Sequence, residues 1–177
     1  MSTSTRYIVP LALGLAMTVG ATPVSASDAS DVSREMKVPT AVVEGVLVNV
    51  DAFFASANGP SNRMVSGVVK ELALKAVRNR IGNLEDSLPG KTSEAAAEDK
   101  NATYKAVVKT TRHETTEIRE CVDNKVTLGA SEGVPVIKDG AFIFDMAHPR
   151  VSSHAWDITF CRTPSASGGF SDWALAK

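Results

Sequence analysis

The sequence predicts an α+β fold in which one or two N-terminal helices pack on an antiparallel β-meander that is closed by one disulfide. Three observations predict it. Apolar residues recur at helical spacing before residue 82, they alternate at strand spacing after residue 102, and both cysteines lie in the strand-like half. Helices followed by consecutive strands are typical of helices gathered on one face of an antiparallel sheet.

Residues 1–26 are expected to be a signal peptide. Arg6 precedes an apolar run that ends at Val19, and small side chains lead up to Ala26. A membrane anchor is the alternative, but the run contains Pro10 and is short of the roughly 20 apolar residues that a bilayer requires. We therefore expect a secreted or periplasmic protein with no transmembrane segment in the mature chain.

The rest of the chain is expected to be a flexible leader over 27–37 and a single domain over 38–177. All basic residues except Arg6 and all acidic residues lie after residue 26, which leaves 18 basic and 20 acidic side chains. Because this balance has no basic excess, nucleic acid is not an expected partner.

The first half is expected to be helical. Residues 41–55 fit a helix by the spacing of their apolar side chains, with Thr40 as its N-cap, whereas their β-branched content also fits a strand. Residues 61–81 carry a clearer helical stripe, and Gly82 is placed for a left-handed C-cap. Residues 83–101 are expected to form a polar connection or a short exposed helix.

The second half is expected to form strands. Strand-like segments cover 103–112, 115–122 and 125–128, with Asp123 and Asn124 as a tight turn or a helical segment as the alternative. A clearer hairpin joins 134–138 to 141–146 through Asp139-Gly140, which suits the positive φ angles of a type I′ turn. Residues 156–161 alternate as a further strand, and 170–175 are expected to form the last one.

The two cysteines are predicted to pair. In an oxidising compartment two cysteines usually form a bridge, and Cys121 with Cys161 is the one intramolecular connectivity. A reactive thiol or a metal ligand pair is the alternative, but neither cysteine belongs to a C-x-x-C motif. No metal site and no cofactor are predicted.

A hydrolytic site is one functional hypothesis. Asp145, His148, His154 and Asp157 lie within 13 positions, in what we interpret as a loop between two strands. A carboxylate could orient one imidazole as a general base, or the group could bind a metal ion. The alternative is a set of exposed polar loop residues.

Other candidates are less specific. His113 with Glu114 and Glu117 fits an ordinary surface charge patch. Trp156 and Trp173 could form a binding strip for a carbohydrate, peptide or lipid, although aromatic residues on paired strands are more often core. Phe142 and Phe144 are also expected to be buried.

No sequence motif of a known catalytic type is present in the chain. The first functional hypothesis is a non-enzymatic exported module that binds a partner protein, an envelope component or a small ligand. The second is a small secreted hydrolase that uses a His/Asp pair between residues 145 and 157. A third is envelope association through the basic face of residues 63–80.

Overall fold

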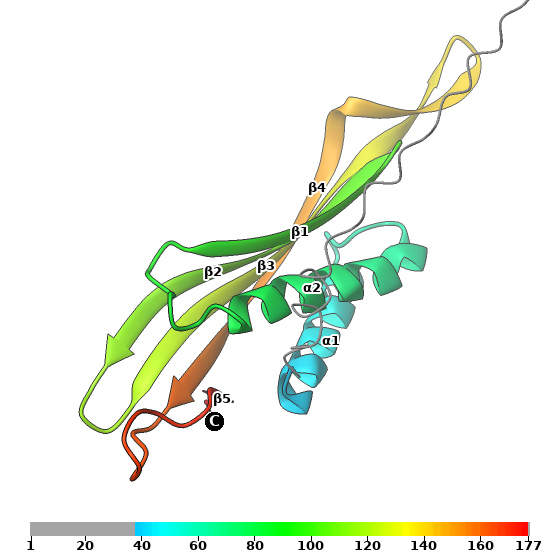
Figure 1. Cartoon of the computed structure of the whole chain (residues 1–177). Helices are drawn as coiled ribbons and strands as arrows, with labels where there is room; N and C mark the ends of the chain where they lie inside the picture. Colours follow the sequence, from blue (N-terminus) through cyan, green and yellow to red (C-terminus); the bar gives the residue numbers. More distant parts are fainter. Residues whose placement is uncertain (1–37, 177) are drawn as a thin grey trace, which may run out of the picture. The chain divides into compact units, whose positions relative to one another are not determined.

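The computed structural model describes residues 38–176 and confirms the α+β class (Figure 1). Two α-helices and a short 3-10 turn precede five strands. The elements are α1 (Thr40–Ala55), the 3-10 turn η1 (Arg63–Val65), α2 (Ser66–Ile81), β1 (Thr92–Asp99), β2 (Ala102–Thr115), β3 (Glu120–Lys138), β4 (Ala141–Arg162) and β5 (Ala174–Leu175).

The strands form one sheet in the order β1-β2-β3-β4-β5, and each neighbouring pair is antiparallel. The β3–β4 hairpin is the longest pair and turns at Asp139 and Gly140. Both residues have positive φ, at 52° and 76°, so the predicted turn is confirmed. The last strand is shorter than predicted, because β5 pairs with only Phe160 and Cys161 of β4.

Residues 40–55 form a helix, which decides between the two interpretations of this segment. Its buried side chains recur every three to four residues, so burial follows one face of a helix. Thr40 is the first helical residue and not the N-cap: Pro39 holds that position, and no side chain caps the helix. The buried residues of α1 are Val42, Val46, Val50, Phe53 and Phe54.

The second helix starts later than predicted. The Asn62 side chain accepts a hydrogen bond from the Met64 N–H and opens η1, so α2 begins at Ser66. The predicted left-handed cap at Gly82 is wrong, since Gly82 has a φ of −62°. Its N–H donates to the Arg78 carbonyl and continues the helical pattern.

The core lies between the two helices and one face of the sheet. Alternate residues of β2, β3 and β4 are buried, and they share one cluster with the buried side chains of α1 and α2. The sheet contributes Tyr104, Ala106, Val108, Val122, Val126, Leu128, Ile158 and Phe160.

Three local predictions are wrong. Asp123 and Asn124 do not form a turn: both lie inside β3, and Asn124 is buried and accepts a hydrogen bond from the Thr110 hydroxyl at 2.9 Å. Residues 145–157 do not form a loop, because β4 runs through them. The expected connection over 83–101 contains strand β1, which pairs with β2 along its whole length.

The predicted signal peptide and leader lie outside the described residues. Within residues 38–176, neither helix combines the length and the apolar character that a membrane span requires.

Candidate functional site

The disulfide prediction is confirmed. Cys121 on β3 lies directly opposite Cys161 on β4, and their sulfur atoms are bonded. The bridge joins the two long strands close to the end of the sheet at which β5 adds to β4. The bridge therefore holds β3 and β4 together next to the two cavities described below, one beside β4 and one around Arg162.

One predicted His/Asp pair is within hydrogen-bonding distance. His148 Nδ1 lies 3.1 Å from Asp145 Oδ2, and this hydrogen bond is the main reason why the pKa of Asp145 is lowered. The His148 side chain is 87% exposed, and neither residue lines the cavities described below. The pair has acid–base chemistry but no enclosed surface to hold a substrate.

The other pair is separated by the sheet. His154 lies on the face that meets α1, where its Nε2 is 3.0 Å from Asn49 Oδ1 and its ring lies between Phe53 and Trp156. Asp157 has the opposite parity along β4 and points to the other face. The strand therefore keeps these two side chains apart, although they are three positions apart in sequence.

The outer edge of β4 is open along most of its length. The Ala176 N–H donates to the Thr159 carbonyl at 2.9 Å, which shows that Thr159 directs its backbone groups outward. In an antiparallel strand every second residue faces the same side, so Ser153, Ala155 and Asp157 also direct their N–H and C=O groups outward. Among residues 38–176, no strand pairs with this segment.

An apolar groove of about 470 Å³ runs beside this open edge. We call it the β4 groove. One wall is α1, where a Cβ added at Gly45 would meet nothing within 4 Å. The other wall is formed by β4 and β5, and the lining residues include Val42, Gly45, Asn49, Trp156, Ile158 and Leu175. The predicted site residue Asp157 also borders the groove.

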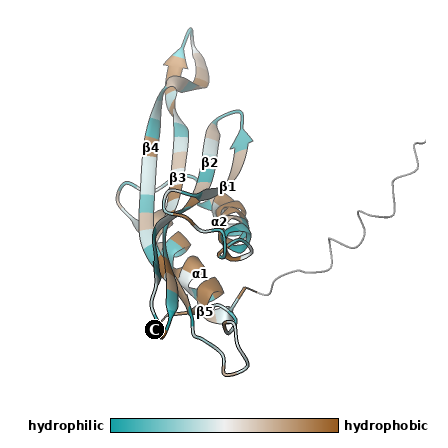
Figure 2. Cartoon of the chain, turned by 60° about the vertical axis from the view of Figure 1, so that its left-hand side comes forward, coloured by the Kyte–Doolittle hydropathy of each residue, from teal (hydrophilic) through white to brown (hydrophobic). Residues whose placement is uncertain are grey.

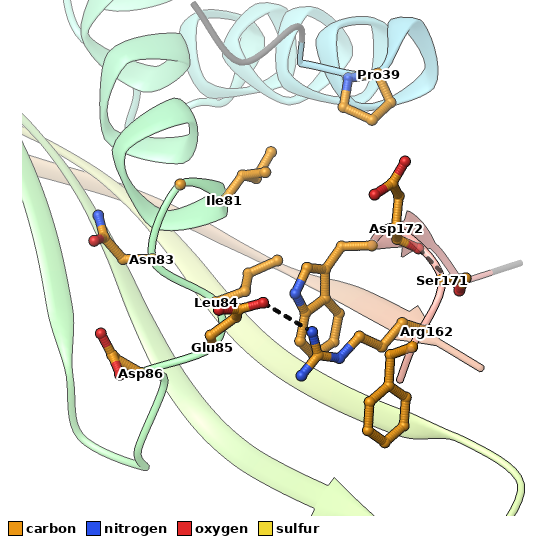
Figure 3. A pocket seen from close by; sticks show the side chains of 12 residues that line it. Pro39, Ile81, Asn83, Leu84, Glu85, Asp86, Arg162, Ser171 and Asp172 are labelled. Carbon is orange, nitrogen blue, oxygen red and sulfur yellow. Dashed lines mark hydrogen bonds and ion pairs between the residues drawn. The ribbon is translucent and has the colours of Figure 1, made fainter. Parts of the chain in front are cut away.

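A second cavity, of about 600 Å³, lies at the end of α2 and is built around Arg162 (Figure 3). The Arg162 guanidinium lies between two aromatic rings, 4.6 Å from the Phe170 centroid and 4.5 Å from the Trp173 centroid. Its Nη1 donates to Glu85 at 3.0 Å and its Nε donates to Glu120 at 2.7 Å. These contacts tie the segment after β4 back onto the sheet.

Glu120 is the buried carboxylate of this network. Burial by itself would raise its pKa, but hydrogen bonds from Arg162 and His113 outweigh burial and hold the pKa below its usual value. His113 Nε2 lies 2.7 Å from Glu120 Oε1. His113 therefore contacts Glu120, across the β2–β3 turn, and not its sequence neighbours Glu114 and Glu117.

A second buried acid, Glu132, lies at the other end of the helices. Glu132 of β3 accepts hydrogen bonds from the Ser61 N–H at 2.7 Å, the Ser61 hydroxyl at 2.8 Å and the Tyr104 hydroxyl at 3.0 Å. Burial opposes ionisation, but these donors prevail and lower the pKa of Glu132. Burial raises the pKa of Tyr104. Glu132 thereby anchors the connection between α1 and α2 to the sheet.

Sequence reasoning missed both buried carboxylates. Glu132 and Ser61 are 71 positions apart, and Glu120 meets Arg162 across 42 positions. Only the strand register brings them together, so no local spacing could indicate them. In the described part of the chain, no group of three or more His, Cys, Asp or Glu side chains is arranged to hold a metal ion.

The chain matches no family model, no curated protein and no solved structure.

Proposed function

We propose that this chain is an exported binding module that holds an extended peptide segment against the outer edge of β4. The observation that carries the proposal is the open edge beside an apolar groove. A strand edge with free backbone groups binds an added strand through main-chain hydrogen bonds, and an adjacent groove selects its alternate side chains.

The chain itself uses this mode of pairing. β5 adds to the same edge, in antiparallel register, with Leu175 opposite Phe160. Among residues 38–176, the last hydrogen bond of this pairing runs from the Ala176 N–H to the Thr159 carbonyl. A guest strand can therefore continue along Asp157, Ala155 and Ser153 in line with β5, without displacing any element of the described fold.

The groove defines the chemistry of the guest. Trp156, Ile158 and Leu175 offer apolar contacts, while Asn49 is the polar group on the helix wall. A guest side chain that points inward would meet these residues and the open space at Gly45. We therefore expect apolar side chains at alternate positions of the guest, with polar residues tolerated between them.

In this proposal α1 and α2 cover one face of the sheet, so the other face and the β4 edge stay accessible to a guest peptide.

Export of the chain would support peptide binding indirectly. The disulfide is compatible with an oxidising compartment, and the apolar run before Val19 is typical of a signal peptide. The Asp145–His148 pair lies in solvent, so an exported chain with this arrangement is better suited to binding than to hydrolysis.

The test is selection of peptides from a random heptapeptide phage library on the wild-type protein, followed by titration of a synthetic peptide from the pool. Ala155→Pro removes one outward N–H without touching the β3 side of β4, and it should weaken binding of that peptide at least tenfold. Ala155→Ser keeps the N–H and serves as the matched control.

A substitution in the groove tests the other half of the proposal. Gly45→Leu should fill the space beside the edge and abolish binding while the protein stays folded. Selection that yields no peptide, or a peptide that binds Ala155→Pro as tightly as wild type, would refute peptide capture at this edge.

A further inference from the structure

The end of the β3–β4 hairpin carries an exposed apolar surface that the β4 groove does not involve. β2 stops pairing with β3 at Glu132, so the hairpin continues beyond it as two strands. We call residues 134–146 the hairpin arm. Figure 1 shows it extending past the ends of β1 and β2, and Figure 2 shows hydrophobic segments along it.

The prediction that Phe142 and Phe144 are buried is wrong. Phe142 is 67% exposed and Phe144 is 41% exposed, and their rings contact each other edge to face at a centroid distance of 5.5 Å. Ile137, opposite Phe142, is 79% exposed. The large exposed apolar residues of the arm are Val134, Ile137, Phe142, Ile143, Phe144 and Met146.

Both faces of the arm are apolar. The register places Ile137 and Phe142 on one face, and the alternation of a strand places Val134 and Ile143 on the other. Strands with apolar residues on both faces are typical of strands that are covered on both sides. A two-stranded hairpin in water is also marginally stable by itself. The arm therefore has the composition of a strand pair in a protein interior.

The arm is anchored by a glycine at its base. Gly133 lies at the register irregularity between Glu132 and Val134, and its N–H donates to the Asn101 carbonyl at 2.8 Å. A Cβ at Gly133 would lie 2.8 Å from Met146 Sδ and 2.9 Å from Phe144 Cβ. Glycine thus allows these two side chains to pack over the base of the arm, which fixes the direction in which it leaves the sheet.

We infer that the hairpin arm is the interface through which two copies of this chain form a dimer. The arm exposes roughly 600 Å² of apolar side chain, if a large apolar side chain has about 200 Å². A pair of arms can cover only one face of each, and the face with Ile137, Phe142 and Phe144 accounts for roughly 370 Å² per arm, or about 750 Å² for two arms. Since about 65% of a homodimer interface is apolar, the whole interface would be about 1,150 Å², close to the lower bound for a specific interface. Homodimer interfaces are also the most apolar class, in keeping with the side chains of the arm.

The charges of the arm favour a second copy over a lipid bilayer. The turn carries Lys138 and Asp139, both exposed, so insertion of the tip into hydrocarbon would carry two charged groups with it. The arm has one lysine against Asp139 and Asp145, and so lacks the basic cluster that attracts anionic lipid. An isologous pair would leave both tips in water while the apolar faces meet.

The test is sedimentation equilibrium of the protein exported from an expression host with its own N-terminal segment. The wild type should sediment at twice the chain mass at micromolar concentration. The double substitution Ile137→Glu and Phe142→Glu should raise the dimer dissociation constant by about 1,000-fold, because each changed residue occurs twice in the interface. Ile118→Glu, at a residue that is 75% exposed outside the arm, should leave the dimer intact.

A photo-crosslink gives a second measurement that does not rely on a charged substitution. Phe142→p-benzoylphenylalanine should yield a covalent dimer on irradiation, and the same group at residue 118 should not. A wild-type monomer, or a dimer that survives the double substitution, would overturn the inference. A monomer that floats with neutral phosphatidylcholine vesicles would overturn it in favour of a lipid surface. Either result leaves the peptide site on β4 to be judged by its own test.

Discussion

Replacement of Arg162 by leucine should destabilise the protein by about 3 kcal/mol, since breaking a buried ion pair leaves an uncompensated charge. Arg162 donates to Glu120, whose side chain is only 8% exposed, at 2.7 Å. It also lies between the rings of Phe170 and Trp173, and each such contact contributes about 0.5–1 kcal/mol.

A double-mutant cycle separates the charge from the packing. Glu120→Gln with Arg162→Leu should recover at least 1 kcal/mol of what Arg162→Leu loses, because it removes the buried carboxylate that has lost Arg162 and keeps only His113 as a partner. Glu85→Gln removes only the exposed partner and should change the free energy of unfolding by less than about 1 kcal/mol.

The assay is urea unfolding at neutral pH, followed by circular dichroism, for the wild type, Arg162→Leu, Glu120→Gln, the double substitution and Glu85→Gln. A cost below 1 kcal/mol for Arg162→Leu, or a double substitution no more stable than the single one, would refute the assignment of Glu120 as a buried charge that Arg162 neutralises.

The remaining predictions concern other parts of the fold. Cys121→Ser should lower the free energy of unfolding by about 4 kcal/mol under oxidising conditions, because the bridge closes a loop of 40 residues; an unchanged melting temperature would contradict it. The pKa of Glu132 is lowered in the folded state, so its contribution to the free energy of unfolding is present above the unfolded-state pKa of about 4.3. This contribution is lost as the pH falls through the lower pKa of the folded state. Glu132→Gln should therefore lower the free energy of unfolding by about 2 kcal/mol at neutral pH. The difference in unfolding free energy between the variant and the wild type, measured by urea titration, should become smaller below about pH 4. Gly45→Ala should raise the free energy of unfolding by up to about 1 kcal/mol, since the added methyl meets no atom; a loss would show that the space is occupied. If the hydrolase hypothesis holds, His148→Ala should abolish turnover of p-nitrophenyl acetate, whereas equal rates for variant and wild type would exclude the Asp145–His148 pair.

The two-part order of helices and strands could be predicted from the sequence because it depends on local periodicity. The buried face of α1 and the Asp139-Gly140 turn are both short-range properties of the chain. The disulfide could be predicted because two cysteines allow one pairing. Each of these predictions needs no knowledge of which segments lie side by side.

The remaining features depend on strand register. Asp123-Asn124 resembles a turn, yet Asn124 is buried because Thr110 on the neighbouring strand satisfies its polar side chain. His154 and Asp157 are close in sequence, but a strand turns them to opposite faces. The alternation of apolar residues also could not show that the part of the hairpin with Phe142 extends beyond the end of β2.

Hydrogen exchange at the backbone amides of Ser153, Ala155 and Asp157 tests the peptide-binding proposal most directly. In the free protein these three N–H groups should exchange fast, while the intervening amides that face β3 are protected. Addition of a selected peptide should slow the three outward amides and leave the intervening ones unchanged. Outward amides that are already protected in the free protein, or that stay fast when the peptide is bound, would contradict strand addition at the β4 edge.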